Sequence, residues 1–177
     1  MELTINNIDD EIKKYLKLVN EIKLNLDKLD VIDFLHVIKR EKLKTGNYPD
    51  VSLFESANRI LSDLVLLAGT KYLLNNKKVG SICLPFDCYN VTFGNDSGND
   101  IHSQNKDGKI LIGEGFNVAK TFFQTKKSNE IRKLNNQNAD YKILIFNSEI
   151  VSKPEIYVNK SKDELIFLPI SIKSQTF

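Results

Sequence analysis

The period of the hydrophobic pattern changes near Lys78, and this change limits the possible folds more than any other feature. Before Lys78, apolar residues recur every three or four positions, as amphipathic helices require. After it, they alternate or form short continuous runs, which is typical of strands. A chain of 177 residues is long enough for one domain. We therefore predict a single α/β (α+β) domain over residues 1–177.

Three helices are predicted in the N-terminal part. The first, a helix or a short coiled coil, follows from a seam of apolar residues at spacings of three and four: Ile12, Tyr15, Val19, Ile22, Leu26 and Leu29. The second begins at the cap Asp30 and reaches the break at Thr45-Gly46-Asn47. The third begins with the capping-box pattern Ser52-Leu53-Phe54-Glu55 and ends near Asn75-Asn76. Residues 1–47 thus form a predicted helical extension.

Strands dominate the rest of the chain. We expect them at residues 79–84, 89–93, 100–104, 109–115 and 141–146. The turn Asn105-Lys106-Asp107-Gly108 joins two of these strands, and residues 94–99 form a loop. The continuous apolar run in 109–115 indicates a central strand that is covered on both faces. A further helix is expected to start at the cap Asn117, before the last strand.

The order of elements from residue 52 is helix, three or four strands, helix and strand. This order favours a core built on a mixed central sheet. The tail, residues 148–177, is predicted to form a peripheral hairpin from strands at 156–158 and 165–172.

The charges are nearly balanced, with 25 basic and 23 acidic residues, so the chain as a whole is not expected to attract a polyanion. One segment differs, because residues 118–134 contain five basic side chains and one acidic side chain. Such a local basic face suits a phosphate backbone, although a solvated helix face explains it equally well.

The sequence argues against several classes of protein. No apolar run approaches the roughly 20 residues of a membrane span, and the start Met1-Glu2-Leu3-Thr4 lacks the basic region of a signal peptide. Gly-rich phosphate loops, HExxH and paired CxxC motifs are absent. Cys83 and Cys88 are too few for a disulfide framework, which favours a cytoplasmic location. A hydrolase built from one of them with His102 is disfavoured, since both cysteines lie in apolar sequence.

Two carboxylates are the most informative candidates for chemistry. Glu114 ends the most apolar strand, where an unpartnered charge costs several kcal/mol, and Asp100 starts the strand that the tight turn joins to it. If Gln104 pairs with Lys109, Gly113 lies opposite Asp100, and Glu114 falls on the other face. Convergence on a shared Mg²⁺ then requires a bulge or a one-residue slip, which the neighbouring glycines allow. Otherwise Asp100 closes a turn and Glu114 pairs with a lysine.

This arrangement resembles the PD-(D/E)xK nuclease superfamily. That family has an αβββαβ core, with an Asp at the head of the second strand and an acidic-x-Lys signature in the third. Asn99-Asp100-Ile101 and Glu114-Gly115-Phe116 are similar to the two halves of its motif, and the resemblance covers residues 52–147. The chain departs from the motif at Phe116, where a lysine is expected.

The run from Glu114 to Ala119 also resembles a branch of type II restriction endonucleases. In that branch the strand reads Glu-x-Glu and continues through an Asn into a helix. Ile112 then occupies the first Glu position, so one metal ligand is unaccounted for. The two alignments assign Glu114 different roles, metal ligand or base, and both stay open.

The resemblance implies a Mg²⁺-dependent site in which Asp100 and Glu114 hold the metal. Glu55, in the preceding helix, is a candidate third carboxylate, although its capping-box position already explains it. The missing lysine is predicted to be Lys126, which shares the apolar face of its helix. Lys120 is the second candidate for this role.

The sequence therefore suggests a Mg²⁺-dependent endonuclease that cleaves double-stranded DNA, of the type II restriction kind and homodimeric. Contacts to phosphates are assigned to Lys127, Arg132, Lys133 and Asn117. The helical extension would be a dimer or DNA-clasping element, or would pack on its own core. The alternative, which Phe116 favours, is a non-catalytic subunit on the same fold that binds DNA or a partner.

Overall fold

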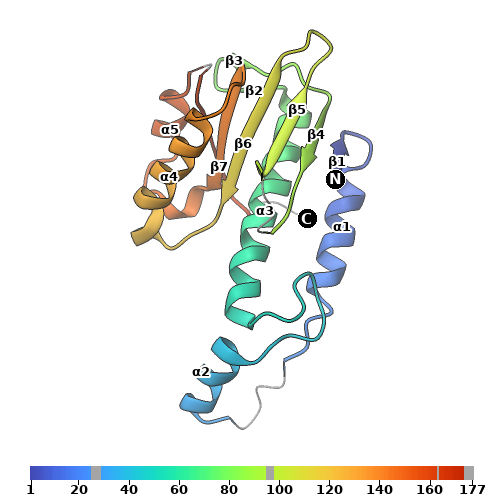
Figure 1. The fold of residues 1–177 in the computed structure, drawn as a ribbon, viewed down its shortest axis with the longest axis vertical. Helices are drawn as coiled ribbons and strands as arrows, with labels where there is room; N and C mark the ends of the chain where they lie inside the picture. Colours follow the sequence, from blue (N-terminus) through green and yellow to red (C-terminus); the bar gives the residue numbers. More distant parts are fainter. Residues whose placement is uncertain (25–28, 95–97, 163, 174–177) are drawn as a thin grey trace.

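One mixed sheet organises the molecule (Figure 1). In the computed structural model, which describes residues 1–24, 29–94, 98–162 and 164–173, six strands lie in the order β1-β4-β5-β6-β7-β8. Their bounds are β1 Glu2–Thr4, β4 Cys88–Val91, β5 Ile101–Gln104, β6 Ile110–Phe116, β7 Tyr141–Asn147 and β8 Ile166–Ile170. The strands from β1 to β6 pair antiparallel, whereas β6, β7 and β8 pair parallel. The predicted mixed sheet is confirmed.

Helices cover both faces of this sheet, with α1 and α3 on one face and α4 and α5 on the other (Figure 1). The helix bounds are α1 Ile8–Val19, α2 Val31–Arg40, α3 Leu53–Asn76, α4 Phe123–Asn135 and α5 Glu155–Asn159. Alternate residues of β7 separate two hydrophobic cores. Ile143 and Ile145 pack on the side of α3, and Leu144 and Phe146 pack on the side of α4. The predicted order of helix, strands, helix and strand is observed.

The long helix α3 begins and ends as its sequence predicts. The Ser52 hydroxyl accepts a hydrogen bond from the Glu55 N–H at 3.2 Å, and the helix ends at Asn76. Its residues 65–70 are all buried, because this half of the helix packs against the sheet. Its first two turns are more exposed and extend beyond the sheet.

The first helix is shorter than the apolar seam predicts. α1 ends at Val19, and the later seam residues Ile22 and Leu29 are not helical. The Thr45 hydroxyl donates to the Glu21 carbonyl at 2.7 Å, which ties the segment after the helix to a distant part of the chain. Leu26 of the predicted seam lies outside the described residues.

The N-terminal segment is only partly an extension. β1, which the sequence analysis missed because a three-residue strand has almost no periodic pattern, pairs with β4 and buries Leu3 completely. α2 is capped by Asp30 as predicted, through a 2.8 Å hydrogen bond from the Asp33 N–H. The helix ends at Arg40, before the predicted break at 45–47. All residues of α2 are described, none is buried, and the helix protrudes from the body (Figure 1).

The strand predicted at 79–84 is split. β2 (Lys78–Val79) and β3 (Ile82–Cys83) pair with each other about Gly80, whose φ of 57° needs no strain in a glycine. This small hairpin lies outside the main sheet. Residues 95–97 of the predicted loop lie outside the described part of the chain.

The predicted peripheral hairpin in the tail is wrong. Residues 156–158 belong to α5, and β8 joins the main sheet parallel to β7. A parallel neighbour requires a crossover, and α5 lies in that connection after a short 3₁₀ turn, Ser148–Ile150. The Tyr157 ring packs edge-on against Phe146 with centroids 5.3 Å apart, so tertiary packing supports a helix where the short apolar run suggested a strand.

Candidate functional site

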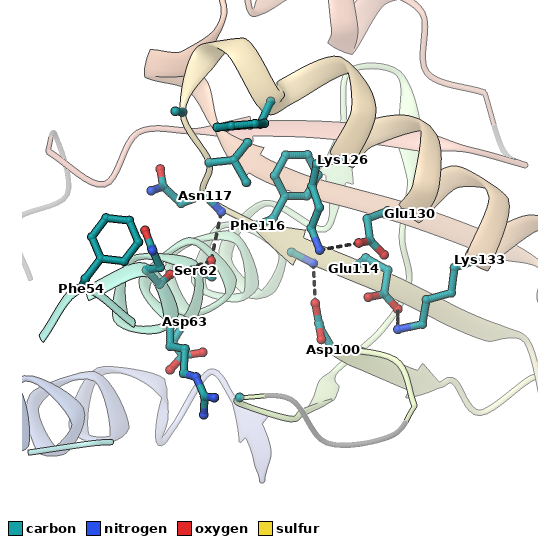
Figure 2. Close-up of a pocket in the computed structure, with 17 residues that line it drawn as sticks. Phe54, Ser62, Asp63, Asp100, Glu114, Phe116, Asn117, Lys126, Glu130 and Lys133 are labelled. Carbon is teal, nitrogen blue, oxygen red and sulfur yellow. Dashed lines mark hydrogen bonds and ion pairs between the residues drawn. The ribbon is translucent and has the colours of Figure 1, made fainter. Parts of the chain in front are cut away.

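A cavity of about 720 Å³ lies where the carboxyl end of β6 meets α3 and α4 (Figure 2). It is lined by the end of the sheet and by one helix from each side of it. Among the described residues that line it are four carboxylates and three cationic side chains: Asp63, Asp100, Glu114, Glu130, Arg59, Lys126 and Lys133. The sequence-predicted residues Asp100, Glu114, Lys126, Lys133 and Asn117 thus share one cavity.

Asp100 and Glu114 face each other across the β5–β6 pair. Ile101 pairs with Gly113, so Asp100, directly before β5, lies opposite Glu114. The predicted register, which placed Gly113 opposite Asp100, is wrong by one residue. The one-residue slip puts both carboxylates on the same face without a bulge.

The turn explains this shift in register. Asn105 donates its N–H to the Lys109 carbonyl at 3.0 Å, so the hairpin loop contains only residues 106–108. The Asn105 side-chain oxygen accepts hydrogen bonds from the N–H groups of Asp107 at 3.0 Å and Lys109 at 2.9 Å. Gly108 is left-handed, with φ of 80°. A three-residue loop with a left-handed glycine is a common hairpin closure.

Each carboxylate has a defined partner. Asp100 Oδ2 accepts a hydrogen bond from the Gly115 N–H at 2.9 Å (Figure 2). Glu114 is only 3% exposed, and its Oε1 lies 2.8 Å from Lys133 Nζ. Lys133 also donates to the Gly98 carbonyl at 2.6 Å, which holds its ammonium group beside the end of the sheet.

Burial perturbs the pKa of both acids. Desolvation, followed by the charge of Asp100, raises the pKa of Glu114 to about 7, although Lys133 opposes the shift. Desolvation also raises the pKa of Asp100, against the Gly115 hydrogen bond and the Lys133 charge. The Glu114 side chain lowers the pKa of Asp100, whereas the charge of Glu130 raises it. Near neutral pH, the pair therefore favours a shared proton or a bound cation.

The lysine beside the carboxylate pair is Lys133, which the sequence analysis placed among the phosphate contacts. The predicted lysine, Lys126, instead lies 2.6 Å from Glu130 Oε1, one turn along the same helix. Spacing of i and i+4 is the usual geometry of such a pair. An acid on the apolar face of the helix, four residues after Lys126, was the sequence signal that this lysine already had a partner.

α3 adds a carboxylate that the sequence analysis missed. Asp63 is 2% exposed, and its Oδ2 accepts hydrogen bonds from the hydroxyls of Tyr15, at 2.5 Å, and Tyr48. Desolvation raises the pKa of Asp63, the two tyrosine hydrogen bonds lower it, and the Asp100 charge raises it further. The signal in the sequence was an acid within the apolar run 61–68.

Asn117 is not a helix cap, in contrast to the prediction. A 3₁₀ turn, Lys120–Phe122, precedes α4, which begins at Phe123. The Asn117 N–H donates to Ser62 Oγ at 3.2 Å, and its side-chain oxygen accepts from Asn147 Nδ2 at 2.9 Å. Asn117 therefore ties the end of β6 to α3 and β7.

Four predicted site residues lie away from the cavity wall. Glu55 pairs with Arg59 at 2.5 Å in the first turn of α3 and is not brought to the carboxylate pair. Lys120 lines a separate hollow beside α5. Lys127 Nζ lies 5.6 Å from the Phe123 ring centroid, and Arg132 is exposed to solvent.

The carboxylate pair fits a Mg²⁺ ion. Proteins usually hold Mg²⁺ through one or two carboxylates, and water and substrate phosphates complete the coordination. Asp100 and Glu114 offer those two carboxylates, and a bound cation would offset the cost of their burial, which raises the pKa of both. Within the described residues, no group of three or more His, Cys, Asp and Glu side chains is arranged for a metal, so water or substrate would provide the other ligands.

Comparison with known proteins gives no assignment: no family model, curated protein or solved structure matches this chain. Of the helices that the structure describes, none has the length and apolar character to span a membrane. The fold and the cavity therefore define the molecule as an α/β protein with a carboxylate and lysine site at the end of a mixed sheet.

Proposed function

We propose that this protein is a Mg²⁺-dependent endonuclease that hydrolyses phosphodiester bonds of double-stranded DNA. One observation supports this proposal above all: Asp100 and Glu114 face each other in a cavity that also contains Lys133. We propose an enzyme of the type II restriction kind, because the run from Glu114 to Ala119 resembles that branch. We also propose a cytoplasmic location, which the free thiols of Cys83 and Cys88 support.

The roles of the residues follow from their contacts. Asp100 and Glu114 would hold the Mg²⁺ ion, which supplies an activated water and neutralises phosphate charge when bound. The Gly115 N–H orients Asp100 for this task. Lys133 holds a proton at Nζ beside Glu114, where it can stabilise negative charge that develops on the phosphate. Glu130 keeps Lys126 at the margin of the same cavity.

Charge gives the cation a second role. The described lining has four carboxylates against three cationic groups, and a proton shared by Asp100 and Glu114 brings the balance only to zero, so without a metal the cavity does not attract a phosphate. DNA is therefore expected to enter the site only when a divalent cation is bound.

Supercoiled plasmid DNA tests the proposal. Wild-type protein should nick or linearise it with Mg²⁺ and leave it intact with EDTA. Glu114→Gln and Asp100→Asn should each slow cleavage by about 100-fold or more, since each removes charge needed in the transition state. Glu155→Gln, at an exposed acid of α5, is the matched control and should cleave normally. Cleavage that both site variants retain would overturn the proposal.

A non-catalytic subunit that binds DNA or a partner is the second candidate. Phe116 favours it, because its ring is 1% exposed and stacks on Phe146, so the third motif position holds no lysine. This candidate predicts that the wild-type protein binds DNA with Ca²⁺ and still leaves plasmid intact with Mg²⁺.

We propose also that two copies associate through α2. Its residues Val31 and Ile32 are each 73% exposed, and Leu35 is 51% exposed. Exposed apolar faces of this kind mark interaction surfaces. Sedimentation velocity should show a dimer for the wild-type protein and a monomer for the double variant Ile32→Asp and Leu35→Asp. A wild-type monomer at micromolar concentration contradicts the dimer.

A further inference from the structure

Two phenylalanine rings lie exposed at the rim of the carboxylate cavity. Phe122, the last residue before α4, is 65% exposed, and Phe54, in the first turn of α3, is 49% exposed. Both line the cavity, and Figure 2 shows Phe54 on the α3 side of it. Large exposed apolar groups beside a polar cavity suggest a surface that a ligand covers.

Neither ring serves the packing of its own helix. The neighbouring Phe123 anchors α4, since it is 2% exposed and its ring lies 5.1 Å from that of Phe146. Phe122 and Phe54 belong to neither of the hydrophobic clusters that the described residues form. Lys39 Nζ lies 3.9 Å from the centroid of the Phe54 ring, so a cation from α2 orients that ring.

The neighbours of the rings indicate the chemistry of this ligand. Asn58, one turn after Phe54, is exposed and lines the same cavity, and its amide can both donate and accept hydrogen bonds. The carboxylates and Lys133 provide the adjacent site for a phosphate with its cation. A flat ring face, an amide and a phosphate site in one cavity match the three parts of a nucleotide: base face, base edge and phosphate.

We propose that the rim formed by Phe54 and Phe122 stacks on an unpaired nucleobase whose phosphate lies at the Asp100–Glu114 pair. This inference rests on the proposed nuclease function and narrows its substrate. In an intact duplex both faces of a base are covered by neighbouring bases, so a ring can stack on a base only where the duplex is opened. The substrate class is therefore DNA with an unpaired base, in a single strand or extruded from a duplex.

Fluorescence anisotropy with a labelled single-stranded oligonucleotide, in Ca²⁺ to suppress cleavage, tests stacking directly. Phe122→Leu keeps apolar bulk and loses the ring, and it should weaken binding about tenfold. Phe122→Trp keeps a ring and should bind within about twofold of wild type. Ile156→Ala, at an apolar residue of α5 that is 40% exposed and outside the cavity, should bind unchanged.

A 2-aminopurine base in the oligonucleotide gives an independent readout. Stacking on Phe122 should change its fluorescence with the wild-type and Trp proteins and not with the Leu variant. Equal binding by wild type and Phe122→Leu, or equal losses with Leu and Trp, overturns stacking. Neither measurement needs cleavage, so stacking stands if plasmid is never cut. Conversely, Mg²⁺-dependent cutting together with unchanged binding by the Leu variant upholds the nuclease and overturns stacking.

Discussion

The two charged walls of the cavity, the end of the β5–β6 pair and the face of α4, hold their side chains in different ways. On the sheet wall, the positions of Asp100 and Glu114 follow from backbone hydrogen bonds of the strands and the turn. The Gly115 N–H further fixes one carboxylate. Little side-chain freedom is left, and Glu114 is buried.

On the helix wall, Lys126 and Lys133 are 43% and 41% exposed, and their flexible side chains are placed by the acids that they reach. They lie seven residues apart, which is about 10 Å along a helix. Their similar exposure conceals different roles, because Lys126 pairs within its own helix and Lys133 pairs with the sheet. Backbone register therefore fixes the positions of the acids in this site, whereas the position of each lysine depends on the acid with which it pairs.

The largest expected difference lies between the two lysines. Lys133→Ala should reduce Mg²⁺-dependent cleavage by about 100- to 1000-fold, since it removes a charge aimed at the reacting phosphate. Lys126→Ala should reduce it less than about fivefold, because this lysine contacts Glu130 and not the carboxylate pair. Single-turnover cleavage rates measure both. Equal losses of cleavage rate in the two variants would show that the two lysines have the same role although they pair with different acids.

Glu114, on the sheet wall, should make the free energy of unfolding depend on pH. The raised pKa of Glu114, about 7 against its ordinary 4.5, means that the folded protein keeps a proton that the unfolded chain releases. The contribution of this proton to the free energy of unfolding is about 3 kcal/mol. It is fully present below pH 4.5 and is lost as pH rises to 7. Urea unfolding from pH 5 to 8 should therefore show falling stability in wild type and a flatter profile in Glu114→Gln. Parallel profiles for the two proteins contradict this.

The two walls should also differ in how far a substitution lowers the free energy of unfolding. A Cβ at Gly115 would lie 2.6 Å from Leu66 Cγ, so Gly115→Ala forces the buried Leu66 side chain or the end of β6 to move. We expect a loss of about 2 kcal/mol in the free energy of unfolding. Ser128→Ala, at an exposed position of α4, should change it by less than about 0.5 kcal/mol. Chemical denaturation measures both, and a tolerated alanine at 115 would mean that the sheet wall can shift.

The smallest effect is expected from the basic residues of α4 that lie off the cavity wall. Lys127 and Arg132 lie off the cavity wall, so the double alanine variant should weaken binding of unrelated DNA sequences by the same factor of about two to five. The slope of log affinity against log salt should fall by about two. Anisotropy titrations at several salt concentrations measure this. Unchanged affinity and slope would place the DNA elsewhere on the surface.

Local features of the sequence predicted much of the fold. Asp30 and Ser52 cap the second and third predicted helices, respectively, because their side-chain oxygens satisfy free N–H groups a few residues away. Glu114 was selected because a charge in an apolar strand needs a partner. Each of these conclusions depends on residues within a few positions of one another, and the structure agrees with each.

The sequence analysis missed two other features, one local and one that depends on contacts between distant segments. The register between Asp100 and Glu114 depends on a loop of three residues in place of four, a difference made by two hydrogen bonds to the Asn105 side chain. β8 pairs with β7 because α5 provides the crossover, which the apolar run alone did not reveal.

The sequence by itself determined most of the helices and strands, with β1 and α5 as the chief exceptions, and that Asp100 and Glu114 meet near one end of a hairpin. Only the tertiary structure decided that they share a face, that Lys133 rather than Lys126 accompanies them, and that Asp63 joins the wall. The physical reason is that burial patterns are periodic along a segment and can be read locally. The partner of a charged side chain depends on distances across the fold, and the spacing of residues along the chain does not contain those distances.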